Sequence, residues 1–177
     1  MLAYLFVLFA VVVRLVLPGF NLWLNFTPVA AALLFFGAHQ PRKRMWIPVL
    51  LLAGSDVLLN LFVYHYALHA EVMVSWVWYA ALLLFGSLLR DNATPAKVFG
   101  ASLFAAFGFF FVSNTAAWAA MEMYPKTVQG LMTAYVAAIP FFRNELVSDV
   151  LFSALFFSIP VALQHLKLVP AKVRVRS

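Results

Sequence analysis

The chain alternates between long apolar stretches and short polar interruptions, a pattern that predicts membrane-spanning helices. We expect helices over Met1 to Pro18, Met45 to Tyr66, Val72 to Leu89, Lys97 to Met121 and Glu145 to Leu166. Stretches of about 20 apolar residues cross the roughly 30 Å of hydrocarbon in a bilayer. The first stretch has no basic leading region and no small-x-small cleavage site, so it is interpreted as a retained helix and not as a signal peptide.

Two further segments are shorter. Pro28 follows Thr27, and a proline at the first helical position after a threonine N-cap predicts a short or broken second helix that ends near Gly37. The segment from Leu131 to Phe142 is too short to span and contains Pro140, so we expect a re-entrant or surface-lying segment there. The predicted fold is an all-α integral membrane bundle of six transmembrane helices in one domain, with this short segment as a lid.

Composition and charge agree with a membrane protein. Of the 177 residues, 66% are hydrophobic and only 10% are charged, which excludes an ordinary soluble domain. Nine of the 12 Lys and Arg residues fall in loops on one predicted side or in a basic tail over residues 167–177: Arg42, Lys43, Arg44, Arg90, Lys97, Lys167, Lys172, Arg174 and Arg176. The positive-inside rule therefore predicts that both termini are cytoplasmic. The basic excess reports topology and attraction to the lipid bilayer, and nucleic acid is not an expected partner.

Polar residues inside the apolar segments gather in the predicted outer half. Asp56 and Asn60 are spaced i, i+4, as are Asn114 and Trp118, so each pair shares one face of its helix. Intramembrane polar groups face the bundle interior or a water-filled cavity. We therefore expect an outward-facing pocket for a small-molecule substrate, lined by Arg14, Asn25, Thr27, Asp56, Asn60, His65, Asn114, Trp118, Tyr124, Arg143, Asn144 and Asp149.

Each of these residues also has a structural interpretation. Arg14 paired with Asp56 or Asp149 is typical of an ion pair that only holds a bundle together, and buried asparagines commonly join helices. His65 and His69 are spaced i, i+4, but two histidines are more often solvated loop residues than metal ligands. A structural or assembly subunit of a larger membrane complex is therefore the alternative function.

Catalytic chemistry finds no support in the sequence. The chain has no cysteine, no Gly-rich phosphate loop and no Gly-x-Ser-Gly nucleophile of the kind that a rhomboid-type intramembrane protease needs. We expect neither an enzyme nor a bound cofactor.

Several runs of sequence resemble a family of small bacterial integral membrane proteins of unassigned function. They are Arg14-Leu15-Val16-Leu17-Pro18, Asn25-Phe26-Thr27-Pro28-Val29-Ala30-Ala31, Ser55-Asp56, and the stretch from Tyr124 to Asp149, so that the resemblance covers almost the whole chain. That family is similar in architecture to the S components of energy-coupling-factor vitamin transporters. The similarity implies a bacterial cytoplasmic membrane, a vitamin-like substrate bound in the outer half, and an energising ATPase module with a coupling membrane subunit as partner.

The same similarity directs the choice of substrate. A corrinoid is the leading candidate, with His65 or His69 as cobalt ligand, whereas Arg14 or Arg143 suits the carboxylate of another vitamin equally well. S components often dock through an Ala-x-x-x-Ala face on the first helix, and Ala3 and Ala10 do not have this spacing. A solitary arrangement without the shared module is therefore the alternative.

Overall fold

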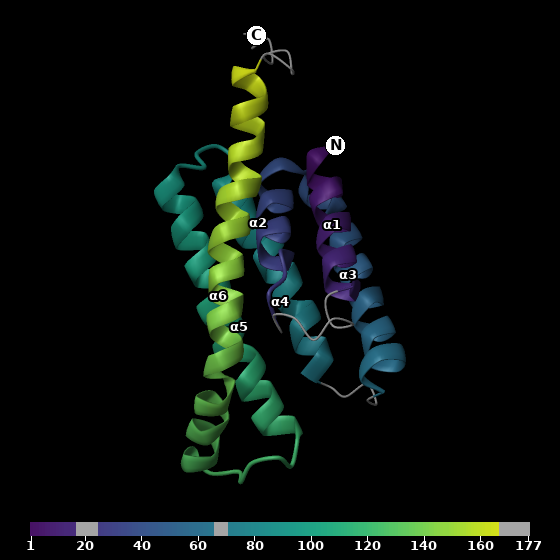
Figure 1. The fold of residues 1–177 in the computed structure, drawn as a ribbon, viewed down its shortest axis with the longest axis vertical. Helices are drawn as coiled ribbons and strands as arrows, with labels where there is room; N and C mark the ends of the chain where they lie inside the picture. Colours follow the sequence, from purple (N-terminus) through teal and green to yellow (C-terminus); the bar gives the residue numbers. More distant parts are fainter. Residues whose placement is uncertain (17–24, 66–70, 167–177) are drawn as a thin grey trace.

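The computed structural model describes residues 1–16, 25–65 and 71–166, which form an all-α bundle (Figure 1). The six helices are α1 (Leu2–Val16), α2 (Val29–His39), α3 (Trp46–Leu59), α4 (Glu71–Gly86), α5 (Pro95–Ala120) and α6 (Val128–His165). A π-helical turn, Asn60–Tyr64, continues α3, and 3-10 turns over Arg42–Arg44 and Ser87–Leu89 precede α3 and follow α4. The predicted class, helix order and short second helix are confirmed.

Four helical segments are long and apolar enough to cross a membrane: Arg42–Tyr64, Val72–Leu89, Pro95–Ala120 and Val128–His165. Large apolar side chains cover their outer faces, and Phe62, Val77 and Leu88 are about 70% exposed (70%, 71% and 70%). Such surfaces are stable against lipid and not against water. The protein is a membrane-embedded multi-pass protein. The described parts of α1 and α2 have 15 and 11 residues, or about 22 and 17 Å, so six complete crossings remain a prediction.

The centre of the bundle is α2. Every residue from Ala30 to Ala38 is buried, and this helix is apolar around its whole circumference. A helix of that kind needs neighbours on all sides, and α1, α4, α5 and α6 surround it. Aromatic rings join these layers: Phe6 of α1 lies 4.8 Å from Phe35 of α2 and stacks on Phe156 of α6 at 4.0 Å between ring centroids.

Two glycines allow α2 and α4 to touch backbone to backbone. A Cβ atom on Gly37 would lie 2.1 Å from the carbonyl oxygen of Leu83, and one on Gly86 would lie 2.4 Å from that of Leu34. Small residues permit this close approach between membrane helices. Arg90, just beyond α4, donates to the carbonyl oxygens of Gly37 (3.1 Å) and Gln40 (2.6 Å), so the C-terminal end of α2 is satisfied by the partner that it crosses.

The prediction of a separate segment between the fifth and sixth helices is wrong. Residues 131–142 belong to α6, which runs unbroken through Pro140 and Pro160 for 38 residues. Proline removes one backbone hydrogen bond, but membrane helices tolerate it where neighbouring helices support the backbone. Here α5 supplies that support, with Phe107 against Phe142 (5.0 Å) and Phe110 against Tyr135 (5.6 Å). The sixth helix therefore begins at Val128 and not near Glu145.

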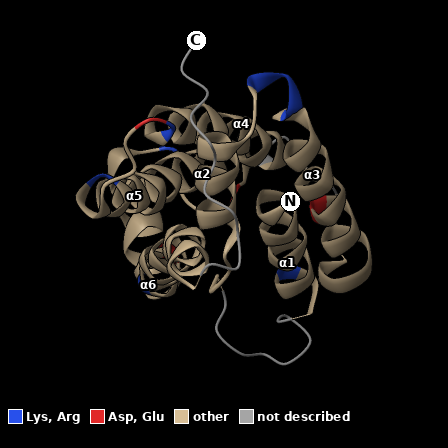
Figure 2. Ribbon diagram, turned by 90° about the horizontal axis from the view of Figure 1, so that it is seen from above, with Lys and Arg blue, Asp and Glu red and all other residues tan. Residues whose placement is uncertain are grey.

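The two ends of the bundle differ in charge. The α2–α3 and α4–α5 connections lie at the same end as the N terminus of α1 and the last turn of α6 (Figure 1). This end, called the basic end below, carries Arg42, Lys43, Arg44, Arg90 and Lys97. Figure 2 shows few Lys, Arg, Asp or Glu residues, drawn blue and red, along the helices themselves, which are mostly tan. The α5–α6 hairpin extends beyond the other helices at the opposite end (Figure 1).

Candidate functional site

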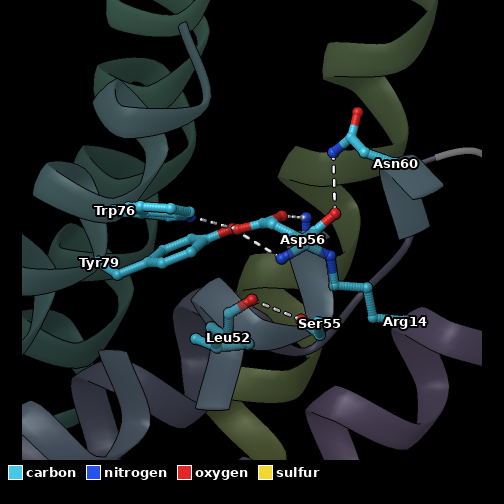
Figure 3. A network of polar contacts seen from close by, with 7 residues as sticks. All are labelled: Arg14, Leu52, Ser55, Asp56, Asn60, Trp76 and Tyr79. Atoms are coloured by element: carbon cyan, nitrogen blue, oxygen red, sulfur yellow. Dashed lines mark hydrogen bonds and ion pairs between the residues drawn. The ribbon is translucent and has the colours of Figure 1, made fainter. Parts of the chain in front are cut away.

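A buried ion pair joins α1 to α3. Arg14 donates to Asp56 Oδ1, and it also donates to the hydroxyl of Tyr79 on α4 at 2.7 Å. Trp76, one turn before Tyr79, donates from Nε1 to Asp56 Oδ2 at 3.0 Å (Figure 3). Three helices thus converge on one carboxylate that is only 4% exposed. The predicted contact between Arg14 and Asp56 is confirmed.

The network continues toward the end of α3. Asn60 donates from Nδ2 to the backbone carbonyl of Asp56 at 2.8 Å, where the α-helix changes into the π-helical turn (Figure 3). Single π-helical turns are frequent at functional sites. His65 ends this turn in the left-handed conformation, at φ 54°, and its side chain is exposed.

A second polar group lies on α6. Glu145, Asp149 and Ser153 follow one another at i, i+4 spacing and so share a face. Asp149 is 2% exposed and Ser153 is 1% exposed, yet Asp149 Oδ2 and Ser153 Oγ have no hydrogen-bond partner among the described residues. A buried polar atom without a partner costs roughly 1–3 kcal/mol. Such atoms call for an explanation, and a bound water, an ion or a ligand group would each supply the missing partner.

The same stretch of α6 touches the start of α2. Ser148 donates from Oγ to the carbonyl oxygen of Thr27 at 3.1 Å. Pro28 occupies the N-cap position of α2, and no described side chain caps this helix. The expectation that Thr27 acts as the N-cap is therefore wrong, because α2 begins one residue later and the threonine contacts α6 through its backbone.

The two polar groups lie at similar depth. Phe6 packs on Phe156, and Phe9 lies 6.2 Å from Phe152, so α1 and α6 are antiparallel neighbours. Because the two helices are antiparallel, each turn toward the C terminus of α1 corresponds to one turn toward the N terminus of α6. Continuing from the Phe9–Phe152 pair, Arg14 and Asp149 lie at the same depth to within about one helical turn. The N terminus of α2 lies at this level too, roughly 17 Å from the basic end, a distance of about half the thickness of a hydrocarbon layer.

The remaining polar residues of the α5–α6 hairpin form a third group. Asn114 donates to the carbonyl of Phe110 in its own helix (2.7 Å), and Trp118 donates from Nε1 to the carbonyl of Pro125 (2.9 Å). Lys126 donates to the carbonyls of Trp118 and Met121. These donors are satisfied within the hairpin and its turn, and none of these bonds reaches Asp56 or Asp149.

The other predicted site residues are spread around these groups. Asn25 is exposed, with φ 64°, directly before the N-terminal end of α2. Arg143 is exposed on α6, whereas Asn144 and Tyr124 are half-buried. His69 lies outside the described residues. No group of three or more His, Cys, Asp or Glu side chains in the described part of the chain is placed to hold a metal ion.

Sequence reasoning missed Tyr79 of the first buried group, Ser153 of the second, and the neighbouring Ser148. Tyr79 could have been found from its position three residues after Trp76, which places both on one face of α4. Ser148 and Ser153 flank Asp149 on α6, but serine is common in membrane helices, so its presence alone gave no signal.

Comparison with protein families gives one match. The family described as "Family of unknown function (DUF6580)" matches residues 1–171. The chain belongs to DUF6580. No curated protein and no solved structure matches the chain. Membership of DUF6580 and the apolar helices together agree with a small membrane protein of unassigned function.

Proposed function

We propose that the protein is a substrate-binding membrane protein for uptake of a vitamin-like micronutrient. In this proposal the bundle has the architecture of an S component, with both termini on the cytoplasmic side of a bacterial inner membrane. The substrate lies between the start of α2, the Arg14–Asp56 pair and the Asp149 face of α6.

The observation that carries the proposal is the unpartnered oxygen of Asp149 at the depth where α2 begins. Transporters commonly bind substrates near the bilayer midplane, at the ends of helices that run only partway across. The N-terminal end of the short helix α2 carries the positive end of the helix dipole. It lies next to Ser148, and no described side chain caps it. No donor from the described residues reaches the Asp149 oxygen, and a substrate group that donates a hydrogen bond would satisfy it.

These groups favour a substrate that both donates and accepts hydrogen bonds. Asp149 Oδ2 accepts from an N–H or O–H group, and the first-turn N–H groups of α2 donate to an oxygen. Carboxamides combine both properties, and corrinoids carry them around their periphery, so a corrinoid remains the first candidate. Because His65 is exposed at the end of the π-helical turn, its role as cobalt ligand belongs to this proposal and requires a substrate that reaches that end.

Release of the substrate to the cytoplasm requires either rocking of the whole bundle or a partner that supplies work, and the chain contains no Gly-rich phosphate loop for using ATP itself. An energising ATPase module with a coupling membrane subunit is the partner that the proposal implies. Of the small-residue pairs at i, i+4 spacing, Ala101 and Ala105 are buried in the core (3% and 1%). Ala116 and Ala120, at the far end of α5, are less buried and are the better candidates for a docking face.

The test is binding of a vitamin panel, corrinoids first, to the purified full-length protein by calorimetry. Asp149→Asn keeps the shape of the side chain and replaces one accepting oxygen by an amide NH2 group that only donates, and it should weaken binding by about 10-fold, as expected for the loss of a buried hydrogen bond. Ser158→Ala is the matched control, because that hydroxyl is exposed on α6 and donates to its own helix at Ala154. Asn114→Ala and Arg143→Ala test whether the pocket extends to the hairpin.

Two results would refute the proposal. One is that no member of the panel binds, in which case a structural or assembly subunit is the better description. The other is that Asp149→Asn binds the identified substrate as tightly as Ser158→Ala does. Thermal unfolding of both variants establishes that each is folded.

A further inference from the structure

A groove runs between α3 and α4 near the basic end. Its volume is about 440 Å³, within the range of small-molecule and lipid sites. Apolar side chains form its walls, among them Trp46, Val49, Leu50, Ala80 and Leu84, and Arg42 lines it as its one charged residue. Trp46 and Leu50 are each 61% exposed and Leu84 is 53% exposed, so the groove opens on the outer face of the bundle.

Arg42 differs from the neighbouring arginines in its contacts. Arg90 donates to two carbonyl oxygens at the end of α2, and Arg44 donates to the Gln40 side chain at 3.4 Å. Arg42 makes no side-chain hydrogen bond or ion pair with any described residue, and it is exposed. Its guanidinium, with five donors, is therefore available to a ligand at the end of an apolar channel.

We propose that this groove binds an anionic phospholipid. Its acyl chain lies along the apolar walls, and its phosphate accepts hydrogen bonds from Arg42. Two observations favour this occupant. The groove lies between two helices that are long and apolar enough to cross a membrane, and its apolar side chains are exposed. Lys43 and Arg44, which follow Arg42 in the same 3-10 turn, add positive charge near its end. A zwitterionic lipid brings its own cation next to these residues and gains less from them.

Native mass spectrometry of the purified full-length protein tests the proposal. The probes are phosphatidylglycerol and phosphatidylcholine with identical acyl chains. We expect the parent protein to bind phosphatidylglycerol about fivefold more tightly, which corresponds to the roughly 1 kcal/mol that one basic residue contributes near an anionic surface. Arg42→Gln should remove most of this preference, because Arg42 is the one charged residue that lines the groove, while leaving the phosphatidylcholine affinity nearly unchanged.

Two further variants separate the groove from general charge. Lys97→Gln removes one positive charge from the same end of the bundle but outside the groove, so the preference should remain. Ala80→Phe fills the groove from an exposed position and should weaken binding of both lipids severalfold. Equal binding of the two lipids by the parent would overturn the proposal. An equal loss of preference in Arg42→Gln and Lys97→Gln, or unchanged binding by Ala80→Phe, would do so as well.

Discussion

The backbone contact between α2 and α4 predicts that replacing glycine by alanine destabilises the protein at this contact and stabilises it at glycines elsewhere. Replacing Gly37 or Gly86 by alanine places a Cβ atom 2.1 Å from the Leu83 oxygen or 2.4 Å from the Leu34 oxygen. Both obstacles are backbone atoms, which no side-chain rotation can move. Ordinary contact begins near 3.4 Å, so the two helices must separate by about 1 Å at the crossing.

The magnitude follows from two opposing terms. Overpacking of this kind costs roughly 1–3 kcal/mol, whereas glycine to alanine inside a helix gains about 0.5–1 kcal/mol. We therefore expect Gly37→Ala and Gly86→Ala each to lower the free energy of unfolding by about 1–2 kcal/mol. Gly54 on α3 and Gly100 on α5 have no neighbouring atom within 4 Å of an added Cβ, so alanine there should stabilise the protein by about 0.5–1 kcal/mol.

Thermal unfolding of the four variants in one detergent measures the difference. A gap of about 2 kcal/mol between the two classes corresponds to roughly 4–8 °C for a chain of this size. The comparison is matched in chemistry, because all four variants make the same change at a helical glycine. If Gly86→Ala and Gly54→Ala unfold at the same temperature, then α2 and α4 are not in backbone contact and the central position of α2 is wrong.

Two other predictions concern the buried charges and the orientation. Arg14→Met and Asp56→Leu should each lower the free energy of unfolding by about 2–3 kcal/mol, because each variant leaves one charge without its partner. This loss is smaller than the full cost of breaking a buried pair, because the Arg14 side chain is 21% exposed and partly screened by its surroundings. The double variant should lose less than the sum in chemical unfolding, and strictly additive losses would contradict a direct ion pair. A reporter domain fused after Ser177 should behave as cytoplasmic, because the basic residues lie at the end of the bundle where α6 ends. An extracytoplasmic signal would contradict the predicted orientation, and the proposed pocket would then open toward the cytoplasm.

The positions of most helices follow from the sequence, because a membrane environment requires every apolar spanning segment to satisfy its own backbone hydrogen bonds. In lipid, every backbone polar group must be bonded internally, so long apolar stretches become helices whatever their neighbours are. The bounds of α5 and the short α2 follow in this way. The Arg14–Asp56 pair was predictable as well, because an intramembrane carboxylate needs a cation and Arg14 is an arginine inside another apolar segment.

The tertiary structure decided what depends on distant contacts. Pro140 predicted the end of a helix, yet α6 continues through it because Phe107 and Phe110 of α5 pack along that stretch. The crossing of α2 and α4 depends on two glycines 49 residues apart, 37 and 86, and no local pattern relates them. The same holds for Asp149: its sequence neighbourhood does not show whether a donor is nearby, and only the packing of α6 buries its Oδ2 where no donor from the described residues reaches it.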